Sequence, residues 1–333
     1  MQKIKIINGT YKIRGKDVDL AGMVFPLVEG FKWGTKGSYI TVDAKDIAGF
    51  PDRNIKIMVP DEDSFEKVDA ETKITKREES DEEVIDRMRE RFDMLEDMTR
   101  AAKKGTVRAM IVSGPPGVGK SFGVEKVLGK HDLIATLGEK APKYEVVKGA
   151  MSAIGLYCKL FNYADKDNVL VFDDCDSIFA DELSLNILKA ALDSKKTRTI
   201  HWNTDSFKLR NEGVPDSFEF KGSAIFITNL KFDKAKGKIR EHLMALESRC
   251  HYIDLTIDTD REKMLRIKQI TRDGMLDEHK FADDLVQEII DFVDINKNRL
   301  RELSLRTVLK VADLAKAFPA KWEAMAENTV MKR

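Results

Sequence analysis

The sequence predicts an α/β fold: a parallel five-stranded sheet covered by helices, preceded by a small β-rich domain and followed by a helical one. Apolar runs short enough for strands alternate with helical patterns between residues 106 and 256. Continuous apolar strands of this kind belong in a parallel sheet whose two faces are both covered. From about residue 258 onward the pattern is helical, which indicates a separate helical domain.

The predicted core spans residues 83–256, and the predicted helical domain spans residues 257–333. The core begins with an amphipathic helix that starts near Glu83 and stops at Gly105. The candidate strands of the core are Arg108–Ser113, Tyr144–Lys148, Val169–Phe172, Ala224–Thr228 and His251–Leu255. The candidate helices of the second domain are Asp260–Arg272, Phe281–Val293 and Leu305–Phe318.

Residues 1–60 are expected to form a small β-rich domain, which is the natural place for recognition of a partner or client. Short β-like runs are separated there by glycine-containing turns. The runs are Lys3–Ile7, Tyr11–Arg14, Ser38–Val42 and Asn54–Val59. Residues 61–82 are crowded with Asp, Glu and Lys and have few apolar anchors, so we expect an exposed charged linker there.

The composition is that of an ordinary globular protein. Of 333 residues, 42% are hydrophobic and 34% are charged, and 57 basic residues balance 57 acidic ones. This balance argues against a surface that binds nucleic acid everywhere, although a local basic stripe is compatible with it. The three cysteines lack the paired spacing of a zinc site. No apolar run approaches the ~18 residues needed to span a bilayer, so we expect a cytoplasmic protein.

A phosphate-binding loop is the most specific motif. Residues 114–121 fit G-x-x-x-x-G-K-[ST] in full, between an apolar strand and a helix. Backbone N–H groups of such a loop wrap the phosphates of a nucleotide, and the helix N-terminus adds positive potential. Lys120 is expected to pair with the β- and γ-phosphates, and the Ser121 hydroxyl to reach Mg²⁺. The candidate ATP-binding residues are Gly114, Pro115, Pro116, Gly117, Val118, Gly119, Lys120, Ser121 and Phe122.

Two carboxylates stand at the end of the next buried strand, Val169-Leu-Val-Phe-Asp173-Asp174. An acid at the tip of a core strand is where a metal-holding residue should lie. Asp173 is therefore expected to orient Mg²⁺, directly or through water. Asp174 is placed to polarise an attacking water. The other interpretation is that acids here cap the next helix, a role that we expect for Asp176 and Asp181.

Taken in order, these segments resemble the AAA+ family of ring-forming ATPases over roughly residues 85–318. The strand Ile225-Phe-Ile-Thr228-Asn229 ends in a polar residue, and the resemblance implies that Asn229 senses the γ-phosphate. Ser248-Arg249-Cys250 is similar to a segment of clamp-loader subunits, which implies that Arg249 reaches the nucleotide of a neighbouring subunit. The other interpretation of Arg249 is an arginine that stabilises the end of its own helix, and Arg240 is the reserve candidate.

A further match lies in the helical domain, which the resemblance identifies as a lid. Ser304 is a plausible N-cap, and Arg306 matches the position from which such a lid touches the nucleotide, with Arg301 as the alternative. The amino-acid sequence of the core also resembles AAA-family proteins encoded by bacteriophages. This resemblance implies that the protein is located in the host cytoplasm. One departure is Asp174, where the family usually has Glu. The shorter side chain predicts slow hydrolysis.

The resemblance implies an ATPase that binds ATP and Mg²⁺ at the subunit interfaces of a homo-oligomeric, hexameric ring and remodels a protein client. The first alternative is a DNA replication or recombination ATPase, of the clamp-loader or helicase-loading kind. The second is a scaffold that ATP assembles but that barely hydrolyses it. A GTPase fits less well, because no guanine-reading Asn-Lys-x-Asp follows a late strand.

Two segments are candidates for contact with the substrate of a ring. Met151, Ile154, Leu156 and Tyr157 follow the second core strand, either as an apolar grip or as the buried face of a helix. The segment Lys195–Gly222 is too long for an ordinary connection, so we expect an inserted hairpin. Basic residues that would contact nucleic acid phosphates are Lys195, Lys196, Arg198, Lys208 and Arg210, and then Lys231, Lys234, Lys236, Lys238 and Arg240.

Overall fold

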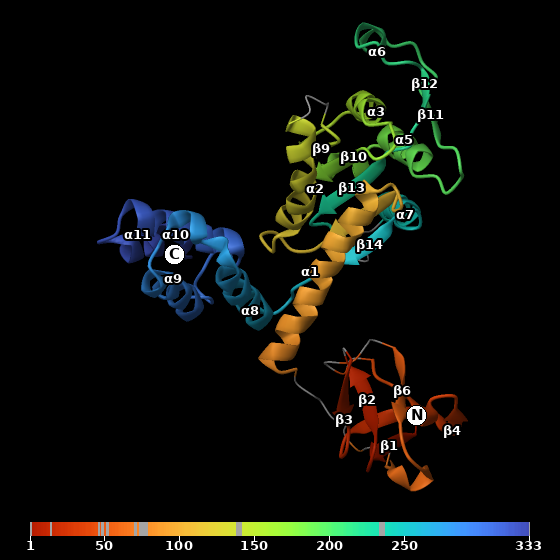
Figure 1. Cartoon of the computed structure of the whole chain (residues 1–333), viewed down its shortest axis with the longest axis vertical. Helices are drawn as coiled ribbons and strands as arrows, with labels where there is room; N and C mark the ends of the chain where they lie inside the picture. Colours follow the sequence, from red (N-terminus) through yellow and green to blue (C-terminus); the bar gives the residue numbers. More distant parts are fainter. Residues whose placement is uncertain are drawn as a thin grey trace. The chain divides into compact units, whose positions relative to one another are not determined.

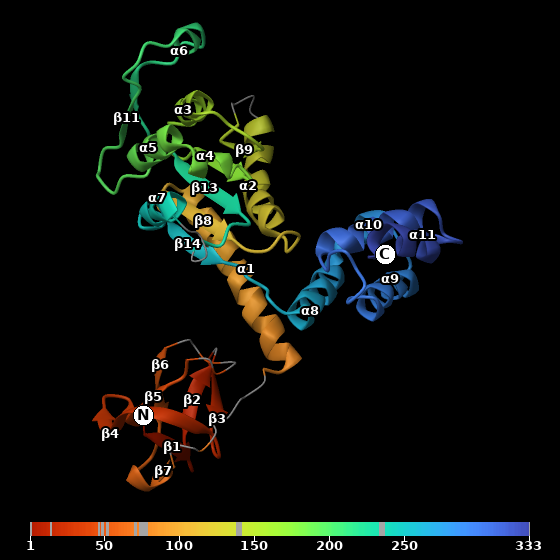
Figure 2. The same cartoon turned by 180° about the vertical axis from the view of Figure 1, so that it is seen from behind.

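The computed structural model describes residues 2–13, 15–45, 47, 50, 53–69, 72, 79–137, 142–232 and 237–332. Figures 1 and 2 show it from two opposite sides. The chain divides into two compact units, Met1–Val84 and Ile85–Arg333. The first unit has its own hydrophobic cluster, which includes Ile4, Phe25 and Ile57.

The first unit is a seven-stranded sheet with strand order β3-β2-β6-β5-β4-β1-β7. Alternate residues of β1, Ile4 and Ile6, are fully buried, because successive side chains of a strand point to opposite faces. The strands are β1 (Lys3–Ile6), β2 (Thr10–Ile13), β3 (Lys16–Asp19), β4 (Val24–Gly34), β5 (Gly37–Asp43), β6 (Asn54–Met58) and β7 (Phe65–Val68).

Three strands of this unit, β3, β4 and β7, were not predicted from the sequence. The expected linker over residues 61–82 is wrong at its start, because β7 pairs there with β1, with Lys3 opposite Val68. The charged side chains of this strand made it look like a linker in the sequence. An edge strand pairs through its backbone alone, so its charged side chains can face water. β4 was not predicted either. It contains Pro26 and two glycines, which weaken a strand pattern, and its pairing with β5 is irregular near Glu29.

The core of the second unit is a parallel sheet of five strands with the order β14-β8-β13-β10-β9. This confirms the predicted α/β sheet, and the observed strands differ from the predicted ones by a residue at most at either end. The strands are β8 (Ala109–Ser113), β9 (Tyr144–Lys148), β10 (Val169–Asp173), β13 (Ser223–Thr228) and β14 (His251–Asp254). The helices of this part are α1 (Asp81–Lys103), α2 (Lys120–Leu137), α3 (Ala153–Asn162), α4 (Ser177–Ala180), α5 (Glu182–Ala191) and α7 (Gly237–Glu247).

The central strands of this sheet are buried on both faces. Along β8, Ile111 belongs to one hydrophobic cluster, whereas its neighbours Met110 and Val112 belong to another. On the first face, Phe172 of β10 stacks on Phe226 of β13 with ring centres 5.1 Å apart. Polar residues that follow the strands are therefore held at the carboxyl edge of a rigid sheet.

An inserted hairpin is present where the long connection predicted it. Strand β11 (Thr199–His201) pairs antiparallel with β12 (Ser217–Glu219), and the short helix α6 (Phe207–Asn211) lies between them. Figures 1 and 2 show this arm, residues 199–219, extending away from the core sheet. Arg198 fixes its base: the buried guanidinium donates to the carbonyls of Ala191 and Gly222, each at 3.0 Å.

The chain ends in a bundle of helices, called the C-terminal bundle here. It contains α8 (Asp260–Ile270), α9 (Asp283–Ile295), α10 (Leu305–Ala317) and α11 (Trp322–Val330). Thr259 and Glu262 form a capping box that starts α8. A π-helical turn, Thr271–Met275, follows α8 and contains Gly274, whose φ is 97°. The sequence pattern predicted the first three helices but not α11.

Candidate nucleotide-binding site

The phosphate loop connects β8 to α2, as its motif predicted. Gly117 and Gly119 have φ values of 69° and 100°, which a side chain would disfavour. Lys120 is the first residue of α2, so the loop residues precede a helix N-terminus. Val118 is buried, whereas Phe122 is 73% exposed. The loop thus has the backbone shape that lets N–H groups surround a phosphate.

Lys120 is buried at the centre of the loop, with 6% of its surface exposed. Its ammonium group donates to the carbonyls of Gly114 at 2.7 Å and Pro115 at 2.8 Å, and to Oδ1 of Asn229 at 2.7 Å. Burial lowers the pKa of Lys120 to about 8, although the charges of Asp174 and Asp173 oppose the shift. A phosphate group would replace the loop carbonyls as a stronger partner for this ammonium.

Ser121 and Asp173 meet as predicted for metal-holding residues. The Ser121 hydroxyl donates to Oδ1 of Asp173 at 3.0 Å, and Asp173 is 5% exposed at the end of β10. The other carboxylate oxygen, Oδ2, lies 3.2 Å from Nζ of Lys148. Hydroxyl and carboxylate oxygens are suitable ligands for Mg²⁺, which takes few protein ligands and relies on phosphates and water for the rest. These two residues therefore fit such an ion.

Asn229 and Asp174 lie beside this pair because β13 and β10 are adjacent in the sheet. The Asn229 side chain accepts from Lys120 through Oδ1 and donates through Nδ2 to Oδ1 of Asp174 at 3.0 Å. Asp174 has φ 53°, a left-handed conformation that costs about 1 kcal/mol for a residue with a side chain. Its amide is bonded to Ile227 at 3.0 Å, which holds the carboxylate at the loop.

The neighbouring acids behave differently from one another. Asp181 caps α5, since its side chain accepts from the amide of Ser184 at 2.8 Å. Asp176 stands at the N-cap of α4 but makes no capping bond, so that prediction is wrong. It accepts instead from the Thr228 hydroxyl at 2.7 Å. Burial raises the pKa of Asp176, although the bond from Thr228 opposes the shift.

The C-terminal bundle contacts the phosphate loop through the start of α10. The Leu305 amide donates to the Gly117 carbonyl at 3.1 Å, and the charge of Arg306 is close enough to Lys120 to lower its pKa. Arg301 instead donates to the carbonyl of Met331 at 3.0 Å, which favours Arg306 over that alternative. Ser304 occupies the N-cap position, but its hydroxyl makes no capping bond.

Arg249 follows the C-terminal end of α7. Its guanidinium donates to the carbonyl of Ala245 at 2.6 Å and to the Ser248 hydroxyl at 3.4 Å. These contacts match the helix-terminal interpretation within one chain, and Arg249 is exposed. Arg240, also exposed, lies within the same helix. The role of either arginine toward a neighbouring subunit stays a prediction.

The expected apolar grip is wrong for two of its residues. Leu156 and Tyr157 are fully buried in the hydrophobic cluster beneath α3. Tyr157 packs against Trp202 and Phe218 and donates to the carbonyl of Pro215 at 3.0 Å, so it anchors the arm. The helical spacing of these side chains served to pack α3, which is the commoner use of such a pattern.

Most basic residues in and just before the arm are buried or lie near acidic residues of the same chain. Arg198 is buried, Lys208 lies 3.9 Å from Glu212, and Arg210 is paired with Asp205. Lys195 and Lys196 are exposed. In the following run, Lys231 is paired with Asp258 at 3.1 Å. Lys234 and Lys236 lie outside the described residues, as does the side chain of Lys238.

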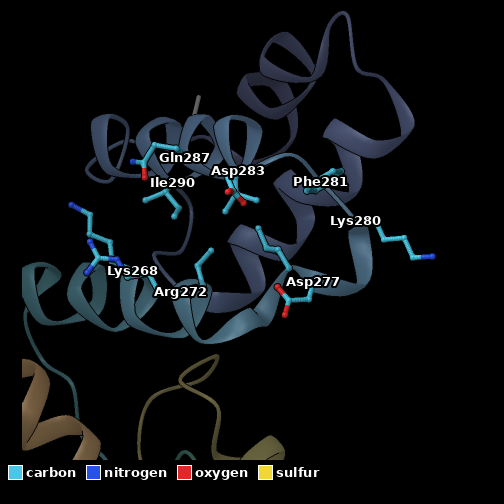
Figure 3. A pocket seen from close by; sticks show the side chains of 11 residues that line it. Lys268, Arg272, Asp277, Lys280, Phe281, Asp283, Gln287 and Ile290 are labelled. Atoms are coloured by element: carbon cyan, nitrogen blue, oxygen red, sulfur yellow. The ribbon is translucent and has the colours of Figure 1, made fainter.

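A separate cavity of about 520 Å³ lies in the C-terminal bundle. Figure 3 shows Ile290 and Gln287 of α9 on one side, with Arg272 and Asp277 on the other. None of the predicted site residues lines this cavity, so it is distinct from the phosphate loop.

Sequence reasoning did not identify Lys148 or Arg266. Lys148 ends β9 directly opposite Asp173 in the sheet register, and the hydrogen bond that Lys148 donates to Glu125 is the main cause that raises the pKa of Lys148. The order of the strands would have been needed to find it. Arg266 looks like one more cation on a charged helix in the sequence, yet it is buried near the loop.

No family model matches the sequence. The chain is 36% identical over 258 residues to a 36.7 kDa protein from the nrdC-mobD intergenic region of enterobacteria phage T4. The match covers 76% of this chain and 78% of the T4 protein. This chain belongs to the family of that T4 protein. The expected similarity to phage-encoded proteins thus has one curated example, whose name states no activity.

Similar solved structures include domain III of the replication initiation protein DnaA from Thermotoga maritima, with TM-score 0.40 and 11% identity over 72% of this chain and 92% of that chain. The Aeropyrum pernix ORC2 protein in its ADP form has TM-score 0.40 and 13% identity, over 78% of this chain and 71% of that one. At these TM-scores the similarities do not indicate a function. Within the described ranges, no helix is long and apolar enough to cross a bilayer.

Proposed function

We propose that this chain is an AAA+-type ATPase that binds ATP with Mg²⁺ and hydrolyses it. The observation that carries the proposal is the convergence of Lys120, Ser121, Asp173 and Asn229, joined by bonds of 2.7 and 3.0 Å at one edge of the sheet. Three segments far apart in the sequence supply these groups. Their order along the chain is the order that the family resemblance implies.

Each residue has a chemical role in this proposal. Lys120 neutralises charge on the terminal phosphates, and Ser121 and Asp173 hold Mg²⁺, which screens the phosphate charge when bound. Asp174 accepts a proton from, or orients, the water that attacks the γ-phosphorus, while ADP leaves. Asn229 is hydrogen-bonded to both Lys120 and Asp174. The loss of the γ-phosphate would therefore affect the positions of both side chains.

The proposal also covers the oligomeric state and the macromolecule on which the ATPase acts. We infer a homo-oligomeric ring, a hexamer, in the cytoplasm of a phage-infected cell. The first candidate activity is the remodelling of a protein client, with the N-terminal sheet choosing the client. The second is work on DNA in replication or recombination, which the resemblance of Ser248-Arg249-Cys250 to clamp-loader subunits and the exposed Lys195 and Lys196 favour.

Replacing Asp174 by glutamate is expected to raise the rate of ATP hydrolysis about tenfold, with ATP affinity unchanged. The longer side chain would bring the carboxylate one methylene closer to the attacking water, and a general base contributes on the order of 10²–10⁴ to such a rate. The measurement is phosphate release by the purified protein at saturating ATP and Mg²⁺. Asp181→Glu is the matched control, because Asp181 caps α5 away from the loop.

The same assay separates the candidate partners when it is repeated with added DNA. Stimulation that falls steeply with salt concentration supports work on DNA. A rate indifferent to DNA supports a protein client. If wild type and Asp174→Glu both release no phosphate under any of these conditions, the ATPase proposal is wrong.

A further inference from the structure

Arg266 is a buried cation without an anionic partner. It lies on α8, and only 6% of its surface is exposed. Within the described part of the chain, no carboxylate forms an ion pair with it; Asp273 and Asp93 act on its charge from a greater distance. Burial lowers the pKa of Arg266 to about 10. A buried guanidinium without a close counter-charge is costly, so its retention calls for a reason.

The hydrogen-bonding capacity of this guanidinium is also only partly used. Nη1 donates to Oε1 of Gln269 at 3.0 Å, whereas the buried Nε has no partner among the described residues. Buried donors in folded proteins are nearly always bonded, and an exception points to a ligand or an ordered water. Phe92 of α1 supports one face of the group, since Cζ of Arg266 lies 3.5 Å from the centre of its ring.

The guanidinium of Arg266 lies next to the phosphate loop. Nη2 lies 3.9 Å from the position that a Cβ at Gly119 would take. Gly119 immediately precedes Lys120, so this is the wall of the loop that would surround the phosphates.

We propose that Arg266 is a second nucleotide-binding arginine of the C-terminal bundle, besides Arg306, and that its unpaired N–H groups bind phosphate oxygens of the nucleotide. This inference rests on the proposed function. The ligand chemistry is a polyphosphate anion, for which a planar guanidinium is well suited. The stack on Phe92 holds the guanidinium in place, so that little rotamer freedom is lost on binding.

The test compares Arg266→Met with wild type in two measurements. Calorimetric titration with ATP and Mg²⁺, and separately with inorganic tripolyphosphate, gives the two affinities. Thermal unfolding without ligand gives the stability. We expect both dissociation constants to rise about tenfold, as for the loss of one charged hydrogen bond. The melting temperature should stay the same or rise, because a buried unpaired charge is replaced by an apolar chain.

Lys263→Met is the matched control, since it removes a cation from the same helix, where Lys263 forms an ion pair with Asp260. Arg266→Lys is the second variant, which keeps the charge but loses the planar fork, and it should show a smaller loss of affinity. Unchanged affinities in the Arg266 variants overturn the inference, whatever happens to stability. Weaker ATP binding with unchanged tripolyphosphate binding also overturns it, because the contact would then be to the base or ribose. If wild type and Lys263→Met bind neither ligand, the proposed function itself fails.

Discussion

Replacing Lys120 by alanine is expected to weaken ATP binding by about a hundredfold or more. In the proposed site the ammonium pairs with the terminal phosphates, and a factor of about a hundred corresponds to the loss of one or two charged hydrogen bonds. The effect should be large because Lys120 is buried, so neither water nor a surface lysine can replace it. Equilibrium titration with a fluorescent ATP analogue measures the change.

The control for this variant is Lys126→Ala on the same helix. Lys126 pairs with Glu96 at 2.9 Å on the surface, and its loss should leave ATP affinity unchanged. The fold of Lys120→Ala should survive, because the hydrogen-bond partners of Lys120 among the described residues are only loop carbonyls and Asn229. Near-wild-type affinity in a folded Lys120→Ala protein would contradict the assignment of the loop.

Replacing Arg249 by alanine is expected to leave ATP binding intact and to lower the hydrolysis rate by about 10³-fold. An arginine supplied in trans is worth on the order of 10³–10⁵ in such reactions, because it stabilises charge only in the transition state. Among the described residues Arg249 bonds only to Ala245 and Ser248 at the end of α7, so its removal should not disturb the phosphate loop. Phosphate release and nucleotide titration on the same sample measure the two effects.

Mixing distinguishes action between subunits from action within one. Arg249→Ala protein keeps an intact nucleotide site, whereas Lys120→Ala protein keeps Arg249. A mixture of the two should therefore recover activity that neither has alone. Arg240→Ala is the parallel variant. Full activity of Arg249→Ala would transfer the role to Arg240, and the failure of both to change the rate would exclude an arginine from α7 or its end.

The core of the fold was predictable because its strands are nearly continuous apolar runs. Val169–Asp173 is buried along its whole length, and the sequence there admits little besides a central strand. Prediction failed where a residue type conflicted with its environment. In β4, Pro26 and the glycines suggested a loop, and in β7 the charges suggested a linker. Both strands are held by pairing with distant partners, which local pattern cannot reveal.

The candidate site was predictable to the extent that strand ends determine it. Parallel strands bring their carboxyl ends to one edge, so Asp173 and Asn229 had to approach the loop once the strands were assigned. Tyr157 was ambiguous, since the same helical spacing suits a grip and a core. Arg266 and Lys148 were not foreseeable, because their importance depends on how α8 and β9 are placed in space.

The most direct test of the central claim is calorimetric titration of the wild-type protein with ATP, in the presence and absence of Mg²⁺. The arrangement of Lys120, Ser121 and Asp173 predicts one ATP bound per chain, with an affinity that Mg²⁺ strengthens. No binding of ATP at millimolar concentration, with or without Mg²⁺, would contradict the account.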